Sequence, residues 1–245
     1  MRRAEVLGLL GRGLRAVPLL AVPLLAVPFG LPRRAEALGG QLPELDRPAP
    51  PFSLQAAGAD GPAGAPLDLQ SFAGHWLVLY FYPRDFTSGC TLEARGFQRD
   101  LASFASLDAA VVGVSADGLE EHASFCSSEG LAYPLLSDPG GAVSRSYGSW
   151  IPPFSQRHTF LIDPQGVLRA RWVAVRPAGH SREVLAALTA LQAVQARRRH
   201  QQGHEAQFIS FRNGRPGAGE AQDAFRGPLG PEKPGTVELQ LRLAQ

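Results

Sequence analysis

The sequence predicts a layered α/β domain in which helices flank a central mixed β-sheet. Residues 76–82 and 109–114 are continuously apolar and rich in residues that favour strands, so each is expected to form a buried strand. Each run is followed by a segment that is expected to be helical. Residues 163–166 (Asp-Pro-Gln-Gly) separate two further strand-like runs and predict a hairpin turn. Strands that alternate with helices, together with one hairpin, are typical of this fold class.

The first half of the domain is expected to contain two short strands and two helices besides the buried strands. A strand at residues 52–55 leads into a loop at residues 57–66 that is rich in Gly, Ala and Pro. The helix after residues 76–82 is predicted from apolar residues that share one face: Ala94, Phe97, Leu101 and Phe104. A second helix is expected at residues 119–129, and a short strand at residues 133–136.

The second half is expected to end in a helix and a tail. Residues 159–162 and 167–173 are the predicted hairpin strands, and Ser181 is expected to cap the helix that follows. That helix has an apolar face made of Val184, Leu188 and Leu191. From Ala196 the chain has few apolar residues, which predicts a disordered tail over residues 198–245.

Residues 1–37 resemble an export signal. Arg2 and Arg3 precede an uncharged apolar stretch at residues 16–31, and a small-x-small pattern allows cleavage after Ala37. The stretch is shorter than the roughly 20 residues of a spanning helix, so no stable membrane span is expected. Cleavage would place the protein in an exported compartment, such as a periplasm or a thylakoid-like lumen. Otherwise a cytoplasmic or organellar location is expected.

Length and composition allow one domain of ordinary size. Residues 38–47 are expected to be a linker, and residues 48–197 form a domain long enough to fold without a disulfide. The formal net charge of +2 is close to neutral, so no nucleic acid is expected as a partner.

Cys90, one of two cysteines in the chain, is the candidate catalytic residue. It follows a buried strand after a sharp turn and lies in the first turn of the next helix. Free backbone N–H groups and the helix dipole at that position favour a thiolate over a thiol. Thr87, three residues earlier, can place a hydroxyl beside the sulfur. The plainer interpretation is a buried, inert thiol.

The residues around Cys90 carry a specific resemblance to a known family. The spacing of Pro83, Thr87 and Cys90 (Pro-x-x-x-Thr-x-x-Cys) is similar to the active-site signature of peroxiredoxins. Residues 81–94 (Phe-Tyr-Pro-Arg-Asp-Phe-Thr-x-Gly-Cys-Thr-x-Glu-Ala) resemble the peroxiredoxin Q, or bacterioferritin comigratory protein, subgroup. The resemblance extends over about residues 48–191.

This resemblance implies a thioredoxin fold and a thiol peroxidase that reduces hydrogen peroxide and organic hydroperoxides without a metal, flavin or haem cofactor. Cys90 would attack the peroxide, Thr87 would orient it, and Pro83 would shield the sulfenic acid from water. Arg157, at the start of a strand, would stabilise the thiolate. Ser88 stands where the subgroup usually has proline, which softens the loop without removing a catalytic group.

Some neighbouring residues have two interpretations. Arg157 is either the thiolate-stabilising arginine or a surface residue of an edge strand. Glu93 either orients Arg157 or is an acid favoured by the helix dipole in the first turn. The histidines show no shared spacing that suggests a metal site, so structural or surface roles are expected for His75, His122, His158 and His180.

The second thiol is Cys126, in the helix predicted at residues 119–129. Many members of the subgroup have their resolving cysteine five residues after the peroxidatic one, where this chain has Arg95. A second variant of the subgroup carries it in the following helix, which implies a Cys90–Cys126 disulfide recycled by a thioredoxin-like reductant in a monomer. Both helices would then unwind locally to form the bond. Alternatively, Cys126 is a small apolar core residue.

Two other functions remain open from the sequence. A thiol–disulfide oxidoreductase of the same fold is expected to carry Cys-x-x-Cys, whereas residues 87–90 read Thr-Ser-Gly-Cys. The other alternative is an exported binding module with a structural disulfide between Cys90 and Cys126. Thiol counting after mild reduction separates a structural disulfide from a catalytic one, because a structural disulfide resists mild reductant and a catalytic one opens readily.

Overall fold

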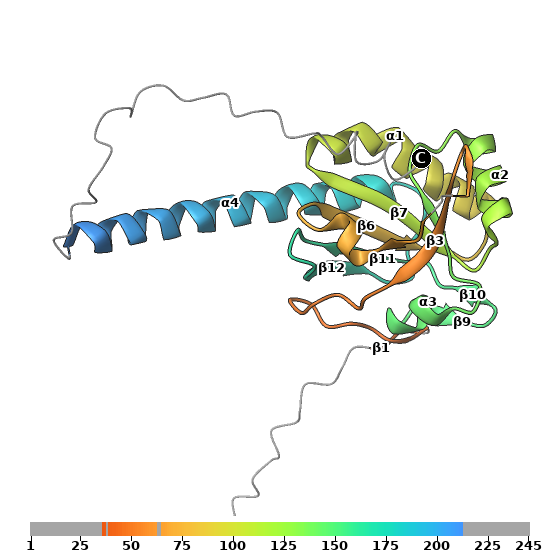
Figure 1. The fold of residues 1–245 in the computed structure, drawn as a ribbon, viewed down its shortest axis with the longest axis horizontal. Coiled ribbons are helices and arrows are strands. Elements are labelled where there is room, and N and C mark those ends of the chain that lie inside the picture. The colour runs from red at the N-terminus through yellow and green to blue at the C-terminus, as the bar shows by residue number, and fades with distance from the viewer. Residues whose placement is uncertain (1–35, 38, 63–64, 213–245) are drawn as a thin grey trace, which may run out of the picture. The chain divides into compact units, whose positions relative to one another are not determined.

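The structure is a computed structural model that describes residues 36–37, 39–62 and 65–212, except the side chains of residues 36–37 and 203–212. A mixed sheet forms its centre (Figure 1). The sheet order is β12 (Leu168–Trp172), β11 (His158–Ile162), β6 (Trp76–Phe81), β7 (Ala109–Ser115), β8 (Leu135–Ser137), β3 (Ser53–Gly58) and β4 (Gly61–Pro62), and β5 (Leu67–Asp68) also pairs with β3.

The two central strands are the ones predicted from continuous apolar runs. β6 and β7 are parallel, and all of their residues are buried. β8 extends the parallel part, whereas β11 and β3 join it in antiparallel pairings. A strand covered on both faces gains stability from every side chain, which explains why these runs do not alternate with polar residues. The predicted mixed α/β sheet is therefore confirmed.

Helices and short elements cover the two faces of the sheet. α1 (Ser88–Ser106), α2 (Leu119–Glu129) and the first turns of α4 (His180–Arg212) pack on one face. The 3-10 helix η1 (Leu69–Phe72) and α3 (Ala142–Ser146) lie on the other, and Figure 1 shows α1 and α2 on the opposite side of the strands from α3. Cys90 and Cys126 both belong to the core between the sheet and the first group of helices.

Three short strand pairings were not predicted. β9 (Trp150–Ile151) and β10 (Phe154–Ser155) form a hairpin near α3, and β1 (Glu36–Ala37) pairs with β2 (Gly40–Gln41). The loop predicted at residues 57–66 begins later than expected, because β3 continues to Gly58 and pairs with β4.

The predicted linker at residues 38–47 is packed onto the domain over its described part, so this prediction was wrong there. Leu42 is buried in the core on the α3 face of the sheet. The backbone N–H of Asp46 donates to the Leu168 carbonyl at 2.8 Å, and the Leu168 N–H donates to the Arg47 carbonyl at 2.9 Å. The outer edge of β12 thus gains backbone partners, and Leu42 gains apolar contacts.

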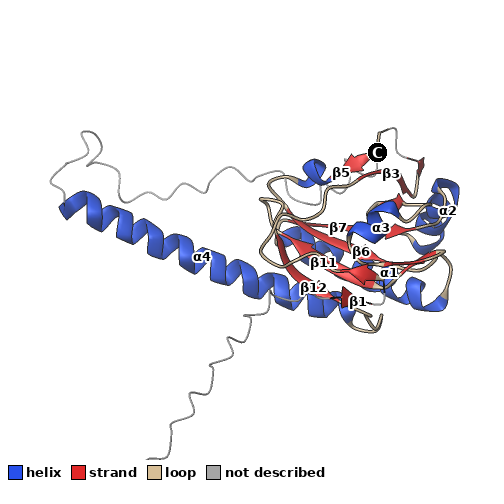
Figure 2. Cartoon of the chain, turned by 90° about the horizontal axis from the view of Figure 1, so that it is seen from below, coloured by secondary structure: helices blue, strands red, loops and turns tan. Residues whose placement is uncertain are grey.

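α4 begins as predicted but ends later. Val184 and Leu188 are buried, whereas Ser181 is not a cap: it lies inside the helix, and its hydroxyl donates to Asp100 at 2.7 Å. The disorder predicted from residue 198 is wrong for residues 198–212, because α4 continues to Arg212 and extends beyond the sheet (Figures 1 and 2). Ala, Arg and Gln are good helix formers, which favours continuation of the helix beyond its apolar face. The predicted export segment and residues 213–245 lie outside the described residues, apart from β1.

None of the helices in the described part of the chain is long and apolar enough to cross a membrane.

Candidate active site

The loop between β6 and α1, residues 82–87, reverses the chain and starts the helix that carries Cys90. The Tyr82 N–H donates to the Val114 carbonyl at 3.0 Å, which continues the sheet one residue beyond β6. Phe86 has a positive φ of 59°, a conformation that non-glycine residues adopt rarely. Thr87 is extended at the N-cap position, and α1 begins at Ser88. The sharp turn expected from the sequence is confirmed.

Cys90 is the third residue of α1 and is buried, with 1% of its surface exposed. Its backbone N–H is therefore among the first four of the helix, which have no partner within the helix. These groups and the positive end of the dipole favour negative charge on a nearby sulfur. The predicted placement of Cys90 in the first helical turn is confirmed.

Arg157 reaches Cys90 because of the register between β11 and β6. His158 pairs with Phe81, so the preceding residue lies beside the loop that leads to α1. Arg157 Nη2 donates to Cys90 Sγ at 3.2 Å. Gly89 leaves room for this approach, because a Cβ at that position would lie 3.3 Å from Nη2. The surface interpretation of Arg157 is wrong, since its side chain is 14% exposed.

Glu93, one turn after Cys90, holds the other end of the guanidinium. Arg157 Nη1 donates to Glu93 Oε2. Burial raises the pKa of Glu93 to about 7, and the charge of Arg157 opposes this shift. Burial also acts to lower the pKa of Arg157, but Glu93 and Cys90 together raise it above its ordinary value. Arg157 therefore remains charged between a sulfur and a carboxyl group.

Thr87 and Pro83 lie in the loop that precedes Cys90. Thr87 is exposed, and its hydroxyl donates to the Arg84 carbonyl at 3.0 Å. Its own carbonyl accepts from the Thr91 N–H at 2.9 Å, which closes the first turn around Cys90. A cleft of about 280 Å³ opens beside Thr87 and is lined by Arg84, Asp85, Phe86, Asp117 and Glu121. Pro83 is half-buried.

Cys126 lies inside the folded structure, away from solvent. It is completely buried on α2, and its sulfur lies 4.0 Å from the Ala57 carbonyl oxygen. Burial raises the pKa of Cys126 to about 12, and Asp85 adds to this shift. Both cysteines are free thiols. The predicted position of Cys126 on the second helix is confirmed, and the thiol cannot react with a large molecule without local opening.

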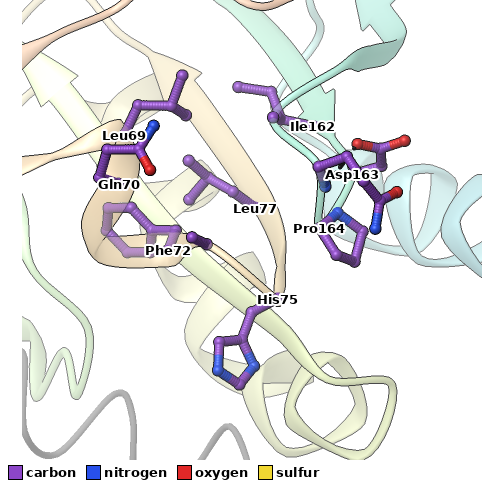
Figure 3. Close-up of a pocket in the computed structure, with 11 residues that line it drawn as sticks. Leu69, Gln70, Phe72, His75, Leu77, Ile162, Asp163 and Pro164 are labelled. Atoms are coloured by element: carbon purple, nitrogen blue, oxygen red, sulfur yellow. Dashed lines mark hydrogen bonds between the residues drawn. The ribbon is translucent and has the colours of Figure 1, made fainter.

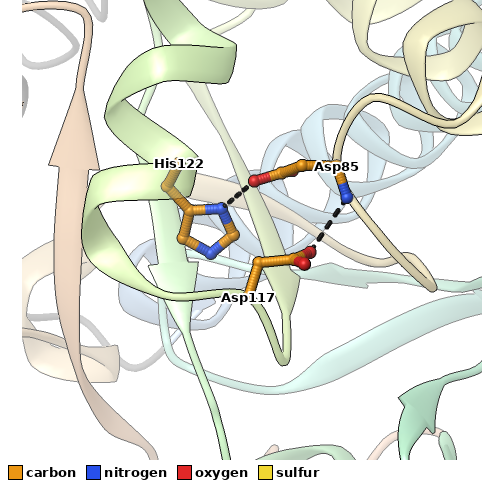
Figure 4. Close-up of side chains that lie close together, drawn as sticks. All are labelled: Asp85, Asp117 and His122. Atoms are coloured by element: carbon orange, nitrogen blue, oxygen red, sulfur yellow. Dashed lines mark hydrogen bonds and ion pairs between the residues drawn. The ribbon is translucent and has the colours of Figure 1, made fainter.

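Asp85, Asp117 and His122 form a buried network that was not predicted from the sequence (Figure 4). His122 Nδ1 lies 2.7 Å from Asp85 Oδ2, and the Asp85 N–H donates to Asp117 Oδ2 at 2.9 Å. The Tyr82 hydroxyl donates to Asp85 Oδ1 at 2.7 Å, and the Ser115 hydroxyl donates to Asp117 Oδ2 at 2.6 Å. One signal was available: His122 lies one helical turn before Cys126.

This network is explained by hydrogen bonds within the protein. The ligand atoms of its three residues lie within 4.8 Å of one another, a spacing compatible with a metal ion. However, both oxygens of Asp85 and one oxygen of Asp117 already accept hydrogen bonds. Two other histidines also contact protein groups: His75 Nδ1 lies 2.6 Å from Asp108, and His180 Nε2 lies 2.8 Å from Thr159.

A separate small cavity of about 90 Å³ lies at the other end of β6 (Figure 3). Its lining includes Phe72 and His75, before β6, and Asp163 and Pro164, from the turn between β11 and β12. Since Cys90 follows the opposite end of β6, this cavity is not part of the candidate active site.

Comparisons with known proteins agree with this geometry. Residues 45–171 match the AhpC/TSA family. A peroxiredoxin Bcp of Xanthomonas campestris is 39% identical over 155 residues, which cover 60% of this chain and 94% of that protein. A solved peroxiredoxin Q structure from Xanthomonas campestris is 38% identical, with a TM-score of 0.53, and the match covers 57% of this chain and 90% of that chain.

Two further structures of that peroxiredoxin Q each carry a cysteine-to-serine substitution. The two substituted positions are as far apart in sequence as Cys90 and Cys126 are in this chain. The fold, the buried thiol in the first turn of a helix and the sequence similarity all agree with the proteins that this chain matches. The chain belongs to the AhpC/TSA family, as a thiol peroxidase of the peroxiredoxin Bcp and Q group.

Proposed function

We propose that Cys90 is the peroxidatic cysteine of an enzyme that reduces hydrogen peroxide and organic hydroperoxides. The observation that carries this proposal is the 3.2 Å contact between Arg157 Nη2 and Cys90 Sγ in the first turn of α1. A fixed positive charge and the helix dipole both stabilise a thiolate there. A buried inert cysteine needs neither the positive charge nor the helix dipole.

In the proposed reaction, the Cys90 thiolate attacks the terminal oxygen of the peroxide. A sulfur–oxygen bond forms while the oxygen–oxygen bond breaks, and the attacked oxygen keeps its hydrogen, so that Cys90 becomes a sulfenic acid. The leaving oxygen takes a proton and departs as water or an alcohol. Arg157, the Cys90 N–H and the Thr87 hydroxyl stabilise charge on that oxygen, provided that Thr87 releases the Arg84 carbonyl. Pro83 shields the sulfenic acid from water.

Cys126 is proposed to resolve the sulfenic acid. Its thiol attacks the Cys90 sulfur, a disulfide forms, and the hydroxyl group of the sulfenic acid leaves as water with the thiol proton. The matching spacing of the substituted cysteines in the Xanthomonas campestris structures supports this assignment. Both thiols are buried in folded helices, so local unwinding must bring their Cα atoms to within about 4.4 to 6.8 Å. A thioredoxin-like protein then reduces the disulfide.

The alternative functions are less well supported. A thiol–disulfide oxidoreductase with a Cys-x-x-Cys motif around Cys90 would need a second thiol at residue 87 or 93, which are Thr87 and Glu93. A binding module with a permanent disulfide is not favoured, because Cys90 and Cys126 are free thiols on separate helices.

The proposal extends to the export, the domain limits and the oligomeric state of the enzyme. Residues 1–37 are proposed to be a cleaved export signal, and the mature enzyme a monomer whose catalytic domain corresponds to about residues 48–197. N-terminal sequencing of the native protein should find a start near Leu38. A start at Met1 or Arg2 would rule out cleavage, and light scattering of the reduced protein tests the monomer.

The central experiment mixes reduced protein with one equivalent of peroxide in a stopped-flow instrument, followed by mass spectrometry. The wild type should form a disulfide between the Cys90 and Cys126 peptides. Cys126→Ser should react once and remain a sulfenic acid when thioredoxin is the donor, whereas Cys90→Ser should not consume peroxide. Turnover by Cys90→Ser would refute the peroxidatic assignment. A Cys90–Cys90 link between two chains would refute only the role of Cys126.

A further inference from the structure

Three consecutive residues of the β6–α1 loop contact α2 or the residues just before it. Arg84 lies 3.9 Å from Asp117, Asp85 contacts Asp117 and His122, and the ring of Phe86 packs edge-on against that of Phe125 at 5.1 Å between centroids. Hereafter, "the tether" denotes these contacts of Arg84, Asp85 and Phe86. It joins the loop that leads to Cys90 with the helix that carries Cys126.

The contact between Asp85 and His122 is the most buried part of the tether. His122 has no exposed surface, and Asp85 is 5% exposed. His122 Nδ1 faces the Asp85 carboxylate (Figure 4). Its Nε2 lies 3.2 Å from the Leu136 carbonyl oxygen. Both ring nitrogens thus face oxygen atoms within hydrogen-bond distance. Removing one partner of such a buried contact leaves the other without a hydrogen bond, which is unfavourable.

The tether connects the two segments that must move for disulfide formation. Phe125 precedes Cys126 directly, and His122 lies one helical turn before it on the same buried face. To expose the Cys126 sulfur, α2 must separate from the loop. To release Cys90, the loop must lose the hydrogen bonds that Asp85 makes through its carboxylate and its backbone N–H. The β6–α1 loop and α2 therefore cannot open without breaking the contacts between them.

We propose that Asp85 and His122 are a positioning pair that sets how often the Cys90 loop and the Cys126 helix open together. This inference rests on the proposed function only for its catalytic consequence. The sulfenic acid on Cys90 has two fates: attack by Cys126, which releases water, or attack on a second peroxide, which gives a sulfinic acid and an alcohol or water. A tighter tether slows the attack by Cys126, so that a larger share of the sulfenic acid is oxidised to sulfinic acid.

Alkylation of Cys126 tests the opening without using peroxide. In reduced full-length protein with Cys90→Ser, Cys126 is the remaining thiol, and N-ethylmaleimide reacts with it at a rate that follows the open population. Adding Asp85→Asn keeps the shape of the side chain but removes its charge. We expect alkylation to accelerate by about tenfold or more.

Global destabilisation must be separated from local opening. Asp163→Asn is the matched control, since Asp163 is equally buried and pairs with Arg169 at 2.7 Å in the turn between β11 and β12. Urea unfolding measures the stability of each variant. The proposal requires that Asp85→Asn accelerates alkylation more than Asp163→Asn does at the same loss of stability. Equal alkylation rates at equal stability would overturn it.

A second variant decides the matter if Asp85→Asn does not fold. Phe86 is 56% exposed, so Phe86→Ala is expected to fold, and it removes the ring contact with Phe125. Alkylation should rise by about threefold. An unchanged rate in this variant would contradict the tether.

The catalytic consequence is measured separately, in the background that retains Cys90. At high peroxide, Asp85→Asn should yield more disulfide and less sulfinic acid for each turnover than the wild type, by about tenfold in their ratio. Faster alkylation without peroxide reduction would support the tether and refute the proposed function. Peroxide reduction with an unchanged product ratio would refute the role of the tether in resolution.

Discussion

The guanidinium of Arg157 joins the sulfur of Cys90 to the buried carboxyl group of Glu93: it donates to the sulfur at 3.2 Å and to the carboxylate through its other terminal nitrogen. A planar fork with several donors makes both contacts at once, whereas an ammonium group acts as a single point. The arrangement therefore fixes both the position and the charge of the group beside the thiol.

Replacing Arg157 should slow the reaction of Cys90 with peroxide. We expect a loss of about 10²-fold for Arg157→Ala and a smaller loss for Arg157→Lys, because lysine keeps the charge but not the fork. Stopped-flow mixing of the reduced variants with hydrogen peroxide measures the rate. Arg169→Ala is the matched control, since Arg169 lies in the neighbouring strand β12 and pairs with Asp163 and Asp46, away from Cys90. A rate within threefold of the wild type in Arg157→Ala would contradict the assignment.

Glu93 predicts a pH dependence of stability. Its folded pKa of about 7 exceeds its ordinary value of 4.5. Its contribution to the free energy of unfolding is therefore fully present below about pH 4.5, declines as the pH rises to 7, and is constant above that. Relative to Glu93→Gln, the wild type should lose about 1.4 kcal/mol for each pH unit within this window. Urea unfolding at pH 5 and pH 7.5 measures the difference. If the free energies of unfolding of the wild type and Glu93→Gln differ by the same amount at pH 5 and pH 7.5, the charge of Arg157 fully offsets the effect of burial on the pKa of Glu93.

The sequence was sufficient where a local pattern determines the structure. The apolar run before the loop, the helical spacing of Ala94 and Phe97, and the turn before Cys90 are all properties of neighbouring residues, and the structure confirms each. Arg157 was found through the motif, although its distance from Cys90 depends on the register of β11 with β6.

Features that depend on remote partners were missed. Leu42 and Asp46 look like linker residues until β12 offers them an apolar surface and a free backbone edge. The contact between Asp85 and His122 joins the β6–α1 loop to α2. The spacing of His122 from Cys126 places it on the buried face of α2, but no spacing within either segment identifies Asp85 as its partner. The end of α4 was placed too early, because helix propensity continues after the apolar face has ended.

Deletion of residues 200–245 should leave the peroxidase rate within about threefold of the wild type. The buried residues in the described part of α4 are His180, Ser181, Val184 and Leu188, all near its start, and the side chains from Ala196 to Gln202 are exposed. A deletion from residue 184 is the control, because it removes Val184 and Leu188 from the core and should unfold the domain. Thermal unfolding and steady-state turnover are measured together. A large fall in melting temperature on deleting residues 200–245 would show that this segment packs on the domain.

Cys126 predicts a second pH dependence, at alkaline pH. Burial raises its pKa from 9.0 to about 12, so the folded state resists ionisation of this thiol. The resulting stability is fully present below about pH 9 and is lost as the pH rises towards 12, because the unfolded chain releases the proton first. We compare Cys90→Ser with the double variant Cys90→Ser, Cys126→Ala under reducing conditions, so that other titrating groups cancel. The advantage of the protein that retains Cys126 should fall by about 1.4 kcal/mol for each unit above pH 9. Urea unfolding at pH 8, 9 and 10 measures it. A constant difference across this range would mean that Cys126 already reaches solvent in the folded state, and disulfide formation would then need no opening of α2.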